Sequence, residues 1–325
     1  MIKNTIKIAL VGQPNVGKSM LINSISNARL KVGNFSGVTV SKEQVFFDYK
    51  NFHIEIVDLP GAYSLNDYTI EEKVTKDFLN NEKYDIILNV LDSTNLQRNL
   101  LLTAELLTLD KKMIIALNMS DEAEKESILI DEIQLSKILG KPCIKTSAAK
   151  KNGITKLLDE ILLKFQSQKV PSKFFFSNVI EEEIENISRV LEENKYETTE
   201  TYRQISLGLL KENKNIYKQF HDEPIWIKIQ PILTEAFEHL FIHFNSKNIK
   251  DIFNEERFAF AKGAVIETVK QKNTNTTTLT ERFDAILIHK FFGLPIFLFF
   301  MWGLFQLTFT IGNIPMEIID SFFAA

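Results

Sequence analysis

Cysteine is almost absent from this sequence, since Cys143 is the only one among 325 residues. A single thiol excludes an internal disulfide and a metal site built from several cysteines, and it fits a reducing compartment. We expect Cys143 to be a small buried apolar side chain in a strand. The five histidines also lack a metal-ligand pattern, because His239 and His243 are four residues apart without a surrounding HExxH motif.

An excess of basic residues is missing too. The chain has 38 Lys and Arg against 42 Asp and Glu, which gives a formal net charge of −4 and a pI near 5.9. This balance offers no positive field for wrapping nucleic acid, so we expect no nucleic-acid partner. The apolar run at residues 6–11 is too short for the hydrophobic region of a signal peptide. We therefore expect the N-terminal domains to lie in the cytoplasm.

Short apolar runs alternate with segments of helical periodicity in the first half of the chain. The runs predict buried strands at residues 6–11, 54–57, 86–91, 113–117 and 142–145. The periodic segments predict helices at residues 17–25, 70–80, 96–109, 131–139 and 154–165. This rhythm favours an α/β fold with a mostly parallel, six-stranded sheet. Residues 43–49 and 52–57 meet at Lys50-Asn51 and predict a hairpin with one antiparallel edge strand.

Only helical signals follow the break near Val170-Pro171-Ser172, at residues 179–193, 199–211, 225–244 and 254–272. We therefore assign residues 1–170 to a first domain and residues 171–272 to an all-α domain. Residues 273–290 are expected to be a threonine-rich linker followed by an amphipathic segment.

The next segment, residues 291–316, contains no charged residue. About 20 apolar residues suffice to cross a bilayer, so we predict a transmembrane helix at residues 291–313. Arg282 and Lys290 favour a cytoplasmic location for its N-terminal side. The alternative is a buried helix in a large soluble core. Residues 314–325 would begin a membrane domain, and because one span cannot enclose a path, transport would need further protein.

A phosphate-binding pattern, GxxxxGK[ST], lies between the first predicted strand and helix. It consists of Gly12, Gln13, Pro14, Asn15, Val16, Gly17, Lys18 and Ser19. The glycines allow backbone N–H groups to converge on phosphates at a helix N-terminus. Lys18 supplies positive charge to the β- and γ-phosphates, and the Ser19 hydroxyl is suited to bind Mg²⁺.

Three further motifs follow in the order expected of a Ras-like P-loop GTPase. In Asp58-Leu59-Pro60-Gly61, Asp58 is expected to reach Mg²⁺ through water, and the Gly61 N–H to meet the γ-phosphate. In Asn118-Met119-Ser120-Asp121, the Asp121 carboxylate can accept hydrogen bonds from N1–H and the N2 amine of guanine, which adenine does not offer. Backbone N–H groups of Ser147, Ala148 and Ala149 can contact guanine O6. A loop after the first helix carries Gly37, Val38 and Thr39, of which Thr39 would sense the γ-phosphate and Mg²⁺.

The glutamine that orients water in Ras-like enzymes is missing, because Ala62 follows Gly61. Hydrolysis would then depend on phosphate positioning and electrostatics, through Lys18, Gly61 and Thr39. In GTPases with a GxPNxGK[ST] loop, an asparagine at the position of Asn15 supports a K⁺ ion that replaces an arginine finger. This resemblance implies K⁺ binding at Asn15, and the alternative is an asparagine that only stabilises the loop.

Longer stretches resemble the ferrous iron transport protein B family. They are NFSGVTV (34–40), DLPGAYSL (58–65), IEEKVTKDFL (70–79), NVLDSTNLQRNLLLTAELL (89–107), NMSDEAE (118–124) and residues 281–312. The likeness covers most of the chain and is weakest over residues 172–250. The family usually has Trp-Pro where this chain has Phe35-Ser36. Backbone carbonyls are the K⁺ ligands proposed there, but Ser36 lacks the fixed φ of proline.

The resemblance implies a GTPase domain tethered to a multi-span Fe²⁺ permease in the bacterial inner (cytoplasmic) membrane. It also implies a helical domain that inhibits GDP dissociation, together with homo-oligomers and small cytoplasmic accessory proteins as partners. We therefore expect slow, K⁺-stimulated GTP hydrolysis that regulates iron uptake through the switch loops.

Two other functions remain open. A soluble K⁺-dependent GTPase of ribosome assembly or tRNA modification shares the GxPNxGKS loop, but it predicts a basic RNA-binding domain and no membrane span. A nucleotide-dependent switch could also control a partner without transport.

Overall fold

The computed structural model describes residues 4–25, 29–35, 40–65, 68–167, 174–198, 200–271, 287–288 and 293–323. The chain divides into two compact units, residues 1–271 and residues 272–325.

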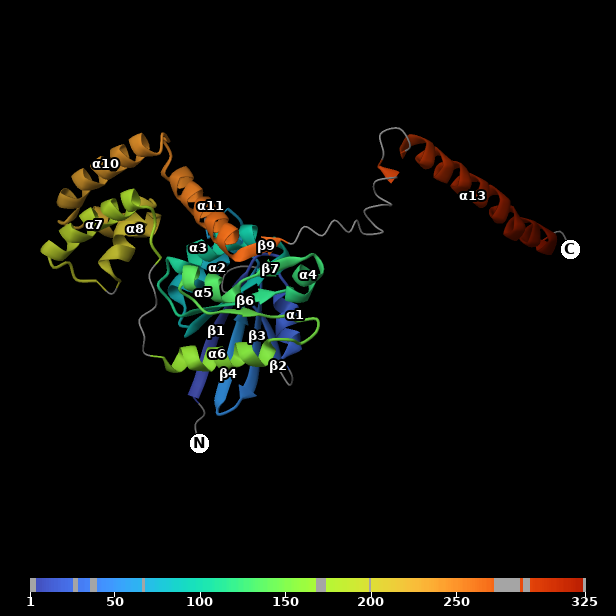
Figure 1. Cartoon of the computed structure of the whole chain (residues 1–325), viewed down its shortest axis with the longest axis horizontal. Helices are drawn as coiled ribbons and strands as arrows, with labels where there is room; N and C mark the ends of the chain where they lie inside the picture. Colours follow the sequence, from blue (N-terminus) through green and yellow to red (C-terminus); the bar gives the residue numbers. More distant parts are fainter. Residues whose placement is uncertain are drawn as a thin grey trace. The chain divides into compact units, whose positions relative to one another are not determined.

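A sheet forms the centre of the first unit (Figure 1). It has seven strands in the order β2-β3-β4-β1-β5-β6-β8. The strands are β1 (Asn4–Gly12), β2 (Arg29–Asn34), β3 (Ser41–Tyr49), β4 (Phe52–Asp58), β5 (Ile86–Asp92), β6 (Met113–Asn118) and β8 (Cys143–Lys145). β4, β1, β5, β6 and β8 are parallel, whereas β3 is antiparallel to both β4 and β2. The predicted mostly parallel sheet and its antiparallel hairpin are confirmed.

The prediction of six strands is wrong by one. Residues 29–34, which fall in an expected loop, form β2 along the free edge of β3, with Arg29 opposite Phe46 and Asn34 opposite Ser41. An edge strand leaves a row of unpaired N–H and C=O groups, and β2 satisfies those of β3. This pairing joins segments that a local hydrophobic pattern does not relate.

Helices cover both faces of the sheet because alternate strand residues point to opposite sides. On β1, Ile6, Ile8 and Leu10 pack against α1 (Lys18–Ser24) and α6 (Ile154–Gln166). Ala9 and Val11 belong instead to the core beneath α2 (Ile70–Asn81), α3 (Leu96–Leu107) and α5 (Glu132–Leu139). Each fully buried Ile or Leu side chain stabilises such a layer by about 1.5–3 kcal/mol.

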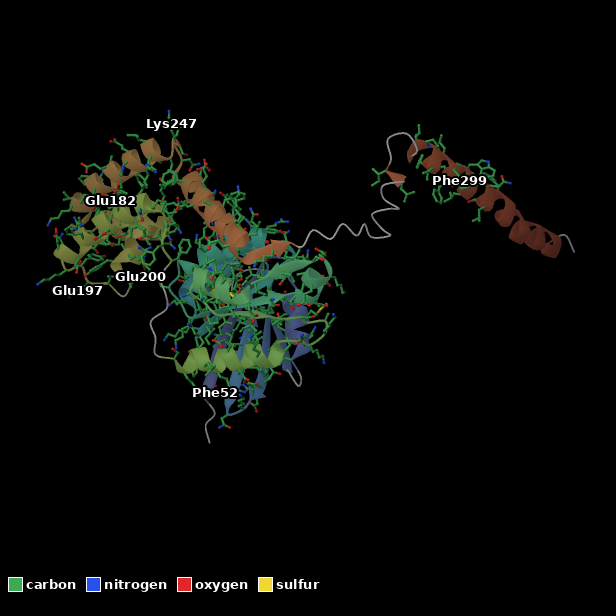
Figure 2. The ribbon with its side chains drawn as sticks, viewed as in Figure 1. Phe52, Glu182, Glu197, Glu200, Lys247 and Phe299 are labelled. Atoms are coloured by element: carbon green, nitrogen blue, oxygen red, sulfur yellow. The ribbon has the colours of Figure 1, made fainter. Side chains whose placement is uncertain are left out.

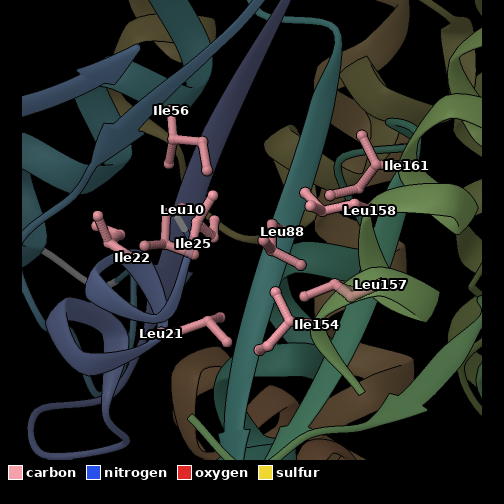
Figure 3. Close-up of a pocket in the computed structure, with 10 residues that line it drawn as sticks. All are labelled: Leu10, Leu21, Ile22, Ile25, Ile56, Leu88, Ile154, Leu157, Leu158 and Ile161. Carbon is pink, nitrogen blue, oxygen red and sulfur yellow. The ribbon is translucent and has the colours of Figure 1, made fainter. Parts of the chain in front are cut away.

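The layer beneath α1 and α6 contains a small internal cavity of about 10 Å³ (Figure 3). Its lining is entirely apolar and consists of Leu10, Leu21, Ile22, Ile25, Ile56, Leu88, Ile154, Leu157, Leu158 and Ile161. That volume is about the space for one water molecule, and a water needs polar partners that this lining lacks. The cavity is therefore a packing gap in the core and not a ligand site.

The remaining part of the first unit is helical. It comprises α7 (Asn178–Glu193), α8 (Tyr202–Leu210), α9 (Lys214–His221), α10 (Trp226–His243) and α11 (Ile249–Thr268). Phe174 and Phe176 stack edge to face on each other and on Phe260 and Phe253 of α11, which anchors the segment before α7. Glu182, Glu197 and Glu200 are exposed on the outer surface of this part (Figure 2).

The helix predicted at residues 254–272 ends earlier than expected, at Thr268. Val269–Gln271 forms β9, which pairs antiparallel with β7 (Ile128–Ile130), a strand that periodicity did not indicate. The Asp131 N–H also donates to the Thr268 carbonyl at 2.8 Å. β-branched Val269 and the ladder with β7 favour the extended conformation over one more helical turn.

In the second unit, α13 runs from Gly293 to Phe323, longer than the predicted helix at residues 291–313. Its side chains are exposed and mostly apolar from Leu294 to Phe309, as Phe299 illustrates (Figure 2). Among the residues that the structure describes, no helix is both long and apolar enough to cross a membrane. The predicted linker lies largely outside the described residues.

Candidate nucleotide site

The phosphate-binding loop joins the carboxyl end of β1 to the first turn of α1. Asn15 and Gly17 have φ angles of 66° and 84°, in the left-handed region. Glycine adopts this conformation without strain, and asparagine adopts it more readily than most residues. A side chain at residue 17 is excluded as well, because its Cβ would lie 2.5 Å from Asn118 Nδ2. These two residues therefore bend the loop directly before α1, which begins at Lys18.

Lys18 lies inside this bend. Its Nζ donates to the carbonyls of Gly12 at 3.1 Å and Gln13 at 3.2 Å. Burial lowers the pKa of Lys18, although the nearby Asp58 carboxylate opposes that shift. Lys18 is thus a partly desolvated cation held at the floor of the loop, where phosphate would complete its charge pairing.

Asp58 ends β4 beside the loop, and its Oδ1 is buried without a hydrogen-bond partner among the described residues. Burial raises the pKa of Asp58 to about 6, while Lys18 lowers it and Glu43 raises it further. A buried carboxylate oxygen without a hydrogen-bond partner can serve as a ligand of a divalent cation. Carboxylate and hydroxyl oxygens are ligands that Mg²⁺ prefers. Ser19 in the first turn of α1 is exposed and offers the hydroxyl.

Asn118 at the end of β6 connects two loops. Its Nδ2 donates to the Val16 carbonyl at 3.0 Å, and its Oδ1 accepts from the Ala148 N–H at 3.1 Å and the Thr146 hydroxyl at 3.4 Å. The side chain is nearly completely buried. Asn118 thus serves the phosphate loop and the loop after β8, and Met119 next to it takes a left-handed φ of 57°.

Asp121 lies in the first turn of α4 (Ser120–Lys125) and has a low exposure of 14%. The Ser147 hydroxyl lowers the pKa of Asp121 by hydrogen bonding, and Lys150 Nζ, 3.4 Å from Oδ2, adds to this effect. Asp121 is therefore a stable carboxylate acceptor. Lys150 was not predicted for the site, because it lies beyond the Ser147-Ala148-Ala149 motif.

The three amides expected to contact guanine O6 differ in their surroundings. The Ser147 N–H donates to the Asn152 carbonyl at 3.0 Å, and the Ala148 N–H is bonded to Asn118. Within the described residues, Ala149 is the exposed member whose amide has no such partner. The geometry thus favours Ala149 for a hydrogen bond to a ligand.

The segment from Leu59 to Gly61 lies directly against the phosphate loop. The Leu59 N–H donates to the Leu10 carbonyl at 3.0 Å and the Thr75 hydroxyl to the Pro60 carbonyl at 3.1 Å. A Cβ at Gly61 would lie 2.9 Å from the nitrogen of Pro14, so only glycine permits this approach.

Two buried glutamates hold the loop that continues from Gly61. Glu72 of α2 accepts hydrogen bonds from the Ser64 N–H at 2.9 Å, the Ser64 hydroxyl at 3.1 Å and the Tyr68 N–H at 3.2 Å. Glu105 of α3 accepts from the Leu65 N–H and forms an ion pair with Arg257 of α11. Both carboxylates were missed, although Thr69-x-x-Glu72 is a recognisable helix-capping sequence.

Gln13 does not turn toward the expected nucleotide. Its side chain is buried and Nε2 donates to the Arg98 carbonyl at 2.7 Å. Gly37, Val38 and Thr39 lie outside the described residues, so their roles stay predictions. Cys143 is buried in β8, and burial raises the pKa of its thiol to about 12, which agrees with an inert apolar side chain.

Comparison with known families agrees with these motifs. Residues 6–161 match the family model described as ferrous iron transport protein B, and residues 176–270 match that of the FeoB cytosolic helical domain. The chain belongs to the ferrous iron transport protein B family. The Fe(2+) transporter FeoB of Campylobacter jejuni is 43% identical over 318 residues, which cover 98% of this chain and 41% of that protein. The chain thus spans about two fifths of the length of such relatives.

Solved structures of the family share this fold. A GDP-bound mutant of S. thermophilus NFeoB is 30% identical, with a TM-score of 0.72 over 82% of this chain and 100% of that one. The cytosolic domain of the T. maritima FeoB iron transporter in its GMPPNP form is 28% identical, with a TM-score of 0.67 over 82% and 99%. The first unit therefore has the Ras-like P-loop GTPase fold joined to the helical domain of this family.

Proposed function

We propose that this chain binds GTP with Mg²⁺ and hydrolyses it slowly to GDP and phosphate. The observation that carries the proposal is the meeting of Lys18, Asp58 and Asp121 at one edge of the sheet, each suited to a different part of the ligand. Lys18 pairs with the β- and γ-phosphates, and Asp121 accepts from N1–H and N2 of guanine. The GDP and GMPPNP forms of related structures support the same ligand class.

Ser19 and Asp58 are the described residues that would hold Mg²⁺, together with Thr39. When bound, Mg²⁺ would neutralise charge on the phosphate oxygens. The chain itself supplies Lys18, the backbone N–H groups of residues 15–19 and the Gly61 N–H, which orient the phosphates and offset the charge that develops on them.

Asp121→Asn should exchange the base specificity. Asparagine cannot accept both guanine donors, but its Nδ2 can donate to the additional oxygen of xanthine. Loss of a charged hydrogen-bond acceptor should weaken GTP binding by about 10- to 100-fold while xanthosine triphosphate binding improves. Competition against a fluorescent GDP measures both affinities.

Asp159→Asn is the matched control, because Asp159 is an exposed acid that pairs with Lys50 and Tyr49. Its affinities should stay at the wild-type values. Unchanged GTP affinity in Asp121→Asn would contradict the guanine site.

K⁺ is the second cation proposed for the site, with Asn15 as its side-chain ligand. Asn15 is exposed at the start of the loop bend, so its amide oxygen is accessible to a cation. Its left-handed φ of 66° supports the alternative too, since asparagine tolerates that backbone conformation.

Two substitutions separate these roles. Asn15→Gly keeps the backbone freedom but removes the side-chain oxygen, whereas Asn15→Ala removes both. If Asn15 binds K⁺, turnover of the wild type should rise on the order of tenfold when K⁺ replaces Na⁺ at constant ionic strength, and both variants should lose this stimulation. If Asn15→Gly is still stimulated by K⁺, the Asn15 side chain has only a structural role in the loop. If the wild type turns over GTP equally fast in K⁺ and Na⁺, the proposal of a K⁺ site is wrong.

The helical domain is proposed to restrain GDP release. Arg257 of α11 pairs with Glu105, whose other oxygen holds the Leu65 N–H in the loop after Gly61. If the loop changes conformation when the nucleotide changes, the Arg257–Glu105 pair would transmit that change to the helical domain. By linkage, a change in the helical domain would alter the affinity for the nucleotide.

Arg257→Ala should speed GDP dissociation by about fivefold or more, because Glu105 is left without its partner and the Leu65 contact loosens. Displacement of a fluorescent GDP in a stopped-flow instrument measures the rate. Arg189→Ala is the control, since Arg189 lies on the surface of the same helical domain and pairs with Glu185, another exposed side chain. If GDP dissociates from Arg257→Ala at the same rate as from Arg189→Ala, the helical domain does not restrain GDP release through this ion pair.

We further propose that residues 291–313 cross the bacterial inner membrane, with the preceding domains in the cytoplasm. The uncharged sequence of this segment and the exposed apolar side chains of α13 support the proposal. Fe²⁺ is the transported substrate that we propose, as the names of the relatives suggest. The alternative as a soluble GTPase acting on RNA is disfavoured by the net negative charge and by the family.

Experiments in cells test the membrane span and the transport of Fe²⁺. The chain of residues 1–325 should stay with membranes after alkaline washing, whereas residues 1–271 should be released. Uptake of radioactive ferrous iron by the cells should be abolished by Lys18→Ala, which removes the phosphate-binding charge. Normal uptake with Lys18→Ala would exclude nucleotide control of transport.

A further inference from the structure

The first turn of α3 places one residue, Arg98, beside both loops that would surround the γ-phosphate. Its backbone contacts the phosphate loop, because the Arg98 carbonyl accepts a hydrogen bond from the buried Gln13 side chain at 2.7 Å. A glutamine held this way fixes the second residue of the phosphate loop against α3.

The side chain of Arg98 serves the other loop. Its guanidinium carbon lies 4.7 Å from the centroid of the Tyr63 ring, a distance typical of a cation–π contact. Tyr63 is two residues beyond Gly61, and the residue is 47% exposed. The contact therefore covers one face of a side chain that otherwise projects into solvent.

The two loops also touch each other between these contacts. The Ala62 N–H donates to the Gly12 carbonyl at 3.3 Å, and Gly61 lies directly against Pro14. Residues 12–14, residues 61–63 and the first turn of α3 thus form a closed set of contacts in which Arg98 contributes two.

We infer that Arg98 is a positioning residue for hydrolysis, acting through Tyr63. By stacking on Tyr63 it keeps residues 61–63 against the phosphate loop, so that the Gly61 N–H stays directed to the γ-phosphate region. A chain with Ala62 in place of a water-orienting glutamine depends on such preorganisation for its rate. The inference rests on the proposed GTPase function and deepens it.

Steady-state GTP hydrolysis by the full chain, in detergent micelles and K⁺ buffer, tests the assignment. Arg98→Ala and Tyr63→Leu should each lower kcat by about two- to fivefold, the rate equivalent of an exposed cation–π contact, with KM nearly unchanged. Arg98→Ala keeps the carbonyl that Gln13 uses, so it removes the side-chain contact alone. The double variant should be no slower than either single variant, because both remove one interaction.

Conservative variants are the matched controls. Tyr63→Phe keeps the aromatic face and should retain the wild-type kcat, and Arg98→Lys keeps a cation and should recover part of the loss. Binding of fluorescent GDP confirms that each variant is folded.

The possible results separate cleanly. Additive losses in the double variant, or an Arg98→Ala effect on KM alone, would overturn the role of Arg98 while leaving the GTPase proposal intact. Absence of hydrolysis by the unaltered chain would refute the proposed function and the Arg98 inference with it.

Discussion

The buried side chain of Asn118 is the constraint on which the site depends. One amide group spans from the Val16 carbonyl to the Ala148 N–H, so the phosphate loop and the loop after β8 cannot move independently. A buried amide that loses either partner leaves a polar group unsatisfied, which costs about 1–3 kcal/mol. The distance between the phosphate end and the base end of the site is thus set inside the protein before any ligand arrives.

The opposite side of the site is held in another way. In the loop after Gly61, Ala62 is buried and Leu65 packs against the core, and the amides of Ser64 and Leu65 donate to the carboxylates of Glu72 and Glu105. Exchange of one hydrogen-bond partner for another changes the free energy little, so the amides of Ser64 and Leu65 can change partners at low cost while residues 61–63 stay against the phosphate loop. The site therefore joins a rigid base pocket to a loop whose position depends on replaceable contacts.

The parts of the fold that local patterns specify were predictable. Hydrophobic runs indicated the buried strands, and the motifs at strand ends indicated Lys18, Asp58 and Asp121, because each motif is a few consecutive residues. β2, α9 and the β7–β9 pair were missed. β7 and β9 are about 140 residues apart in the sequence, whereas β2 and α9 are short elements that pack on the neighbouring β3 and α8.

The same limit applies to the site. Gln13 bonds to Arg98, Asn118 connects two loops, and Glu105 pairs with Arg257, and these partners lie about 30 to 150 positions apart in the sequence. No spacing rule relates such residues. Lys150 is an intermediate case, because it is near the Ser147 motif but reaches Asp121 only through the folded turn.

The ladder between β7 and β9 determines how the chain leaves its first unit. Residues after Gln271 follow β9 directly, and β9 is bonded to the strand that comes after α4 and the Asn118–Asp121 motif. Tension in the following segment would therefore load this short ladder first, before it reached the longer α11. A pull on the C-terminal segment would thus reach the nucleotide domain at β7, which contacts α4 and its Asp121. The three-residue ladder would be the first part of the domain to break under such a pull.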